Sequence, residues 1–178
     1  MFAWTAQIGD SCSPERASSQ RIFPVMIRDE QIARLMGLGA LALLLGALGF
    51  QYLGHLAPCE MCHWQRWPYI AAAITGLLIV SFWKKQARAL AILTIAMVAV
   101  SGLIGAYQAG MQWGFLPGPG ACTVEHAYVL GSGAPPPEVS CNVVTWSLFG
   151  LSLAVYNALI SLALAATGTF LLRRGHGA

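Results

Sequence analysis

The stretch PCEMCHWQRWPY, residues 58–69, brings together the residues of this chain that are best suited to chemistry. Cys59, Cys62 and His63 form the C-x-x-C-H spacing through which a c-type haem is attached. The same C-x-x-C spacing also occurs in redox-active dithiols and in half of many zinc sites. The motif alone therefore leaves three different kinds of protein open.

A second pair of cysteines, Cys122 and Cys141, lies further along the chain, and Cys12 stands alone near its start. Together with the first pair, the second would supply the thiolates of a tetrahedral zinc site. However, the second pair lacks the tight spacing of a zinc signature, and an oxidising compartment would compete with thiolate ligation. We therefore expect no bound metal.

A covalent haem needs a second axial ligand and an enclosing apolar pocket in addition to Cys59, Cys62 and His63. The available second ligands are His55, His126, Met61 and Met111. The motif, however, runs directly into a long apolar stretch, and a haem would give no role to the second cysteine pair or to Arg66. The sequence therefore predicts that no covalent haem is present.

The composition indicates that most of the chain lies in a lipid bilayer. Of its 178 residues, 57% are hydrophobic and only 10% are charged, whereas soluble domains carry about 25% charged residues. A helix needs about 20 apolar residues to cross about 30 Å of hydrocarbon. Four stretches reach this length, at residues 35–56, 64–83, 89–110 and 143–172. We therefore predict an all-α integral membrane protein with a bundle of four transmembrane helices.

The basic residues predict the orientation of these helices. All Lys and Arg residues except Arg66 precede the first span, join the second to the third, or follow the fourth: Arg16, Arg21, Arg28, Arg34, Lys84, Lys85, Arg88, Arg173 and Arg174. By the positive-inside rule these segments face the cytoplasm, so that both termini are cytoplasmic and two loops are periplasmic. We expect a membrane domain over residues 28–174, a cytoplasmic tail of unknown role over 1–27 with Met26 as an alternative start, and a short cytoplasmic tail over 175–178.

This orientation puts both cysteine pairs on the outer side of the membrane. Cys59 and Cys62 occupy the link between the first and second spans, and Cys122 and Cys141 bracket the link between the third and fourth. Two pairs in a compartment where disulfides persist indicate a disulfide system. The Gly- and Pro-rich loop between Cys122 and Cys141 suits either a structural staple or an arm that presents a reactive disulfide to a partner.

The neighbours of the first pair favour a redox dithiol. Pro58 favours a helix that starts near Cys59, which puts Cys59, Cys62 and Arg66 on one helix face. The helix dipole and the guanidinium would both stabilise a thiolate. The simpler interpretation of Arg66 is a side chain that snorkels to the membrane surface. An aromatic belt at the membrane interface is the simplest role of Trp64, Trp67 and Tyr69, and aromatic walls around a flat ligand are the alternative.

These residues resemble the DsbB family of quinone-linked, disulfide-generating membrane proteins, and the detail is similar to the α-proteobacterial branch. The similarity rests on C-x-x-C-x-x-x-R with its aromatic tail and on GAYQAGMQWGFLPGPGACT at the second pair, and it covers about residues 28–174. It implies a membrane thiol-disulfide oxidoreductase of the bacterial inner membrane. Such a protein reoxidises a periplasmic, thioredoxin-like dithiol oxidase of the DsbA type and passes the electrons to ubiquinone or menaquinone.

The resemblance also implies roles for individual residues. Cys59 and Cys62 match the first redox pair, beside the bound quinone. Cys122 and Cys141 match the second pair, which meets the DsbA-type partner. Arg66 matches the quinone-associated arginine, so that it would stabilise both the Cys62 thiolate and a reduced quinone.

Gln108 and Gln112, near the outer end of the third span, are further candidates for quinone contact, with ordinary interfacial polar residues as the alternative. The expected partners are the DsbA-type protein, membrane lipid and the quinone pool, and no nucleic acid. His63 and the short loop between Cys122 and Cys141 depart from the best-known family members. The alternatives are a vitamin-K-reductase-like protein, a non-catalytic four-span scaffold with a structural loop disulfide, and a membrane-anchored c-type haem protein.

Overall fold

The computed structural model describes residues 28–122 and 140–175. The predictions for the N-terminal tail with Cys12 and Met26, for His126 in the loop, and for residues 176–178 lie outside these described residues.

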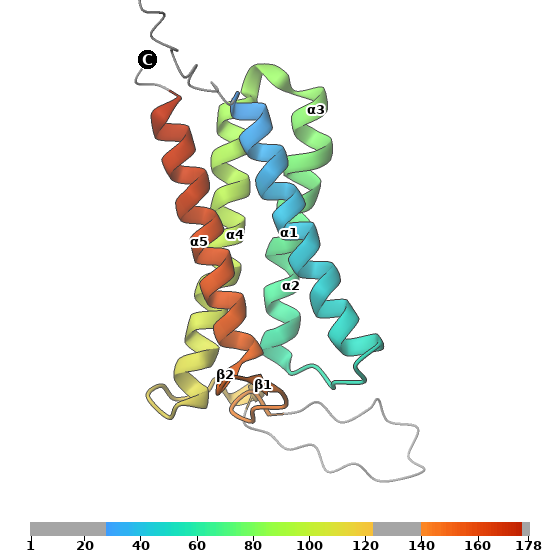
Figure 1. The fold of residues 1–178 in the computed structure, drawn as a ribbon, viewed down its shortest axis with the longest axis vertical. Helices are drawn as coiled ribbons and strands as arrows, with labels where there is room; N and C mark the ends of the chain where they lie inside the picture. Colours follow the sequence, from blue (N-terminus) through green and yellow to red (C-terminus); the bar gives the residue numbers. More distant parts are fainter. Residues whose placement is uncertain (1–27, 123–139, 176–178) are drawn as a thin grey trace, which may run out of the picture.

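The described chain folds into long helical rods that run side by side along the molecule (Figure 1). They are α1 (Asp29–Tyr52), α2 (Glu60–Ala73) with its π-helical continuation η1 (Ile74–Ile79) and α3 (Val80–Phe82), α4 (Ala87–Gln112) and α5 (Leu153–Arg174). Within the described part, three helical segments are long and apolar enough to cross a membrane, namely Asp29–Tyr52, Lys84–Gln112 and Leu153–Arg174. The remaining rod is divided by its π-helical turn into shorter pieces. The prediction of a helical membrane protein is confirmed.

Short elements join the rods. They are the 3₁₀ turns η2 (Lys84–Gln86) and η3 (Gly120–Cys122) and the antiparallel strands β1 (Ser147–Leu148) and β2 (Leu151–Ser152). Phe149 and Gly150 turn the chain between the strands with φ of 50° and 78°, values that suit a tight hairpin and exclude an α-helix. The apolar stretch 143–172, predicted as the fourth span, is therefore helical only from Leu153.

The two ends of the bundle differ in charge and chemistry. One end contains the start of α1, the turn from α3 into α4, and the end of α5, as Figure 1 shows. The basic residues of these segments are Arg28, Arg34, Lys84, Lys85, Arg88, Arg173 and Arg174. The start of α2, the end of α4 and the start of α5, which lie next to the cysteines in the chain, are at the opposite end. The fold thus separates the cations from the cysteines, with Arg66 as the described exception.

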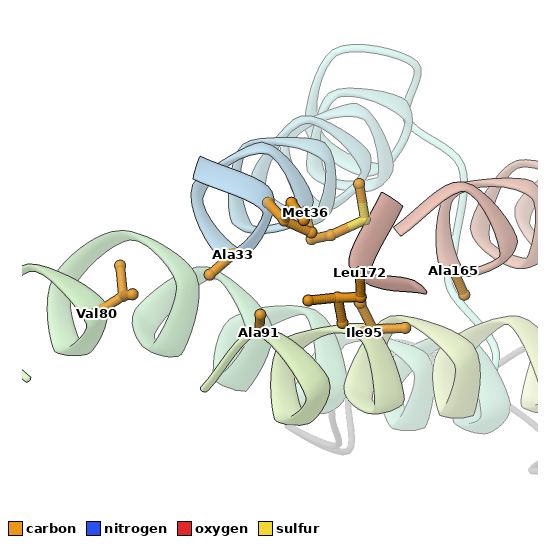
Figure 2. Close-up of a cluster of buried hydrophobic side chains, with 8 residues drawn as sticks. Ala33, Met36, Val80, Ala91, Ile95, Ala165 and Leu172 are labelled. Carbon is orange, nitrogen blue, oxygen red and sulfur yellow. The ribbon is translucent and has the colours of Figure 1, made fainter. Parts of the chain in front are cut away.

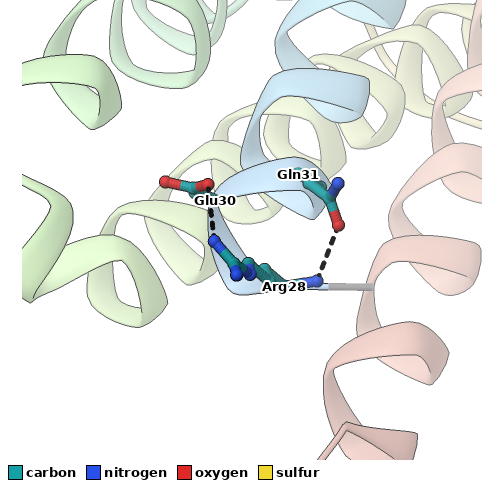
Figure 3. A network of polar contacts seen from close by, with 3 residues as sticks. All are labelled: Arg28, Glu30 and Gln31. Carbon is teal, nitrogen blue, oxygen red and sulfur yellow. Dashed lines mark hydrogen bonds and ion pairs between the residues drawn. The ribbon is translucent and has the colours of Figure 1, made fainter. Parts of the chain in front are cut away.

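The start of α1 is fixed by local polar contacts (Figure 3). The backbone N–H of Arg28 donates to Gln31 Oε1 at 2.9 Å, and Arg28 Nη1 lies 3.9 Å from Glu30 Oε1. The glutamine contact is one half of a capping box, which pairs a helix-terminal N–H that would otherwise remain free.

The basic end is held together by side chains from all the rods (Figure 2). Its buried members are Ile32, Ala33, Met36, Val80, Ala91, Ile95, Ala165 and Leu172. Small residues allow the backbones to approach there, as is common between membrane helices. A Cβ on Gly76 would lie 2.4 Å from the carbonyl oxygen of Ala33 and 2.9 Å from Cα of Gly37. Helix α1 therefore packs directly against the backbone of η1.

Candidate active site

The two cysteine pairs lie together at the end of the bundle opposite the cations. Cys122 and Cys141 form a disulfide with their Cα atoms 5.1 Å apart. This disulfide packs in one buried cluster with Cys59, Met61 and Met111. Because both of its sulfurs are bonded to each other, they are not available as thiolate ligands for zinc. The structure thus brings all the predicted redox cysteines into one place.

The loop disulfide is almost inaccessible. Cys122 is 2% exposed and Cys141 is 1% exposed. The backbone N–H of Cys141 donates to the carbonyl of Cys122 at 3.2 Å, and Ser140 Oγ donates to the same carbonyl at 2.7 Å. A thiolate from another protein could reach these sulfurs only after the cluster opens.

Cys59 and Cys62 are free thiols at the start of α2. Cys59 is the N-cap residue, and its Sγ accepts a hydrogen bond from the backbone N–H of Cys62 at 3.3 Å. Gln108 Nε2 donates to Cys59 Sγ at 3.1 Å and lies 3.7 Å from Cys62 Sγ. Hydrogen bonds of this kind stabilise the charged form of a thiol. The predicted helix start near Cys59 is confirmed.

The two thiols, which precede the predicted span 64–83, shift each other's pKa in opposite directions. The hydrogen bond with Cys59 lowers the pKa of Cys62 from 9.0 to about 6, and Gln108 and the charge of Arg66 act in the same direction. The hydrogen bond with Cys62 and burial both raise the pKa of Cys59. Of the two thiols, Cys62 is therefore the one that loses its proton more readily.

A cavity of about 220 Å³ opens beside Cys62. Most of its wall is apolar and comes from α1, α2 and α5, including Leu43, Phe50 and Leu153. Its polar lining includes Gln51, Gln65, Arg66, Tyr69, Gln108 and Asn157. Gln112 is absent from this lining, because its side chain accepts a hydrogen bond from Ser152 Oγ. Of the two predicted glutamines, Gln108 thus faces the cavity, and Gln112 links α4 to the start of α5.

Two buried polar atoms on the cavity wall have no hydrogen-bond partner among the described residues, Arg66 Nε and Gln51 Oε1. An unpaired buried donor or acceptor costs about 1–3 kcal/mol, so each of these atoms calls for a partner that the described residues do not supply. Arg66 offers a donor and Gln51 an acceptor within a mostly apolar cavity. The donor fits a carbonyl oxygen on a flat apolar ring, as a quinone has, and the acceptor fits the hydroxyl that such a ring carries once it is reduced.

Sequence reasoning overlooked Gln51 and misplaced Tyr69. A glutamine within the apolar run LLLGALGFQY was a usable signal, because polar residues inside membrane helices often mark functional sites. Tyr69 was expected in an interfacial aromatic belt together with Trp64 and Trp67. The tryptophans are 41% and 71% exposed, but Tyr69 is only 3% exposed. The belt prediction is wrong for Tyr69, because its hydroxyl faces Asn157 and Ser161 of α5 inside the bundle. Tyr69 instead lines the cavity, which is where the alternative of an aromatic wall places it.

Comparisons with known proteins agree on one family. The model of the family described as "Disulfide bond formation protein DsbB" matches residues 29–171. A disulfide bond formation protein B from Dechloromonas aromatica is 34% identical over 78% of this chain and 89% of its own length. Proteins with the same description from Aromatoleum aromaticum and a Polaromonas species are 28% and 26% identical, each over 81% of this chain and over 95% and 90% of their own lengths. No solved structure matches the chain significantly.

Proposed function

The chain belongs to the DsbB family of disulfide bond formation proteins, and from this premise we propose that it is a quinone-dependent protein thiol:disulfide oxidoreductase. It reoxidises a periplasmic dithiol oxidase of the DsbA type and passes the electrons to a membrane quinone, ubiquinone or menaquinone. One observation carries the proposal. A disulfide, a dithiol and a cavity with an unpaired guanidinium N–H follow one another within a single site.

The first step takes place at the loop disulfide. A thiolate of the reduced partner attacks Cys122, the bond between Cys122 and Cys141 breaks, and Cys141 leaves as a thiolate. The second thiol of the partner then attacks the mixed disulfide, which releases the oxidised partner and the Cys122 thiolate. Since Cys122 is 2% exposed, partner binding has to open the cluster before exchange can begin.

The second step transfers the disulfide within the chain. The Cys141 thiolate attacks Cys59 of an oxidised Cys59–Cys62 pair, and Cys62 leaves. Cys122 then attacks Cys141, so that the loop disulfide forms again and the first pair is left as a dithiol. Two features support this order. Cys59 and Cys141 lie in the same buried cluster, and the lowered pKa of Cys62 makes it the better leaving group.

The last step returns the first pair to its disulfide. When bound, a quinone accepts the two electrons and two protons that oxidation of a dithiol releases. Cys62 lines the cavity in which the ring would lie. Arg66 would hold a ring oxygen through its unpaired Nε–H, and Gln51 would accept from a hydroxyl. Gln108 would keep an N–H donor on both sulfurs, and the apolar wall would exclude water.

The proposed location is the bacterial inner membrane, with the cysteines on the periplasmic side and both termini in the cytoplasm. The grouping of cations at the opposite end of the bundle supports this orientation. A non-catalytic scaffold would need the loop disulfide alone. It would give no reason for a buried thiol pair next to a cavity with unpaired polar atoms.

The direct test mixes the purified chain with a reduced DsbA-type protein and a soluble quinone, and follows the absorbance of the quinone. We expect catalytic loss of quinone that requires both cysteine pairs, so Cys62→Ser and Cys122→Ser should each abolish it. In Cys62→Ser, mixed-disulfide formation between the partner and the loop should persist. Turnover that continues without Cys62, or no turnover in the unmodified chain, would refute the proposal.

A further inference from the structure

A line of hydrogen bonds connects the interior of the bundle with the sulfur of Cys59. Asn157 Nδ2 of α5 donates to Gln65 Oε1 of α2 at 2.8 Å. Gln65 Nε2 donates to Gln108 Oε1 of α4 at 2.7 Å. Gln108 Nε2 then donates to Cys59 Sγ at 3.1 Å. These three side chains, Asn157, Gln65 and Gln108, are called the amide ladder below.

The amides of the ladder all point in one direction. Each has a donor end and an acceptor end, and each turns its donor towards the sulfur. If one amide were reversed, it would set N–H against N–H or oxygen against oxygen unless its neighbours reversed as well. A fully reversed ladder would bring the oxygen of Gln108, in place of its N–H, against the sulfur. Such a contact would repel a thiolate.

Asn157 is the member whose orientation is fixed from outside the ladder. Its Nδ2 lies 3.4 Å from the backbone carbonyl of Ser101, which can only accept. Its Oδ1 accepts from the hydroxyl of Tyr69 and lies 3.5 Å from Ser161 Oγ. Tyr69 and Ser161 are 3% and 0% exposed, so water does not compete for these contacts. A reversed Asn157 would place its N–H donors away from Ser101.

We infer that Asn157 is a positioning residue, which fixes the direction of the amide ladder and thereby keeps an N–H of Gln108 on the sulfurs of the Cys59–Cys62 pair. The inference rests on the proposed function in that this pair is the one that delivers electrons to the quinone. It adds a residue that lies 98 positions after Cys59 in the chain and acts on the sulfur only through Gln65 and Gln108.

The other groups around the pair do not replace this role. Arg66 is the charged group that acts on Cys62, and the loop sulfurs are bonded to each other. On the same helix, the carboxylate of Glu60 accepts from Trp64 Nε1 at 2.8 Å, and His63 follows Cys62 directly. Helix α5 adds the hydroxyl of Tyr156, which donates to the carbonyl of Leu148. Helices α1 and α4 present uncharged side chains to the cavity.

The test measures the pH at which the reduced pair becomes reactive, with neither quinone nor partner present. The full chain in detergent, with the Cys59–Cys62 pair reduced and the loop disulfide intact, is treated with iodoacetamide between about pH 5 and about pH 9. Alkylation of the Cys59–Cys62 peptide is read by mass spectrometry. Loss of a hydrogen bond to a thiolate raises the pKa of that thiol by about one pH unit or more. Asn157→Leu, close to isosteric, should therefore raise the midpoint by about that amount.

A double-mutant cycle separates positioning from general damage. Gln108→Leu should raise the midpoint at least as much, and Asn157→Leu should add nothing in that background, because no donor is left to orient. Thr94→Val is the matched control. It removes a buried hydrogen bond of α4, from Thr94 Oγ1 to the carbonyl of Leu90, and should leave the midpoint unchanged.

Two results would overturn the inference: an unchanged midpoint in Asn157→Leu, or a shift that adds in full to that of Gln108→Leu. If Asn157→Leu does not fold, Tyr69→Phe replaces it in the double-mutant cycle. We then expect a smaller rise of the midpoint, because the contact between Ser161 Oγ and Asn157 Oδ1 remains. The measurement contains no quinone. A chain without quinone turnover would therefore refute the proposed function and leave the ladder to be judged by its own result.

Discussion

Replacement of Arg66 by methionine tests the quinone half of the chemistry most directly. The substitution keeps an unbranched apolar stem and removes the charge and the N–H donors. Arg66 is half-buried and lines the cavity together with Cys62, and its Nε is unpaired among the described residues. A desolvated charge partner is worth about 1.4 kcal/mol or more, which equals a factor of about ten. We expect quinone-dependent turnover to fall, or the apparent KM for quinone to rise, by about tenfold or more.

The loss should also depend on pH. The charge of Arg66 helps to lower the pKa of Cys62, so Arg66→Met raises that pKa and leaves less thiolate at low pH. At a pH above the pKa of Cys62 in both proteins, Cys62 is a thiolate with or without Arg66. The deficit should therefore be larger near about pH 6 than near about pH 8. Arg66→Lys should fall between the two proteins, because it keeps the charge and loses the planar fork of donors.

Two assays on each protein separate the possible outcomes. One is quinone-dependent turnover, and the other is formation of the mixed disulfide between the partner and Cys122 in the absence of quinone. Arg66→Met should impair only the first. Lys84→Met is the control for loss of charge, because Lys84 is exposed at the opposite end of the bundle. Equal losses in both assays would indicate misfolding, and no loss in either would show that Arg66 merely snorkels.

Further predictions concern haem, topology and packing. The purified protein should show no Soret band that survives denaturation, and a stoichiometric band would refute the redox interpretation of Cys59 and Cys62. In sealed cells, an impermeant thiol reagent should label the predicted outer cysteines only after reduction and should never reach Cys12. If Cys59 were labelled only from the cytoplasmic side, the predicted orientation of the helices would be wrong. Gly76→Ala should lower the unfolding temperature, because the new Cβ would collide with the backbone of α1, whereas Gly49→Ala, with nothing within 4 Å, should not.

The helices and the positions of the cysteines in the fold were predictable because they depend on local properties. Hydrophobicity over about 20 residues identifies a membrane helix, and Pro58 before Cys59 indicates its start. The start of α5 at Leu153, later than the predicted residue 143, was also predictable. Gly150 lies inside the predicted span, and with Phe149 it forms the turn that keeps residues 147–152 out of the helix.

The polar interior was not predictable, because it depends on how the helices rotate about their axes. Gln65 and Asn157 are 92 residues apart, and Gln65 and Gln108 are 43 apart. In the sequence, each of these residues is an isolated polar side chain within an apolar helix, and nothing indicates its partner. Only packing of α2, α4 and α5 turns these residues towards one another. The same packing buries Tyr69, which its position in the sequence assigned to the membrane interface.

The contrast between paired and unpaired polar atoms supports the proposal that the cavity binds a quinone. Inside a bilayer no water is available to satisfy a polar group, so the protein must provide the partner itself. Asn157, Gln65 and Gln108 do so through the amide ladder. Arg66 Nε and Gln51 Oε1 line the same cavity and find no such partner in the described chain. An oxygen that accepts from Arg66, and that after reduction carries a hydroxyl able to donate to Gln51, would satisfy them, and quinone chemistry provides both forms. A structural scaffold would gain nothing from leaving these atoms unpaired, whereas the proposed quinone would use both of them.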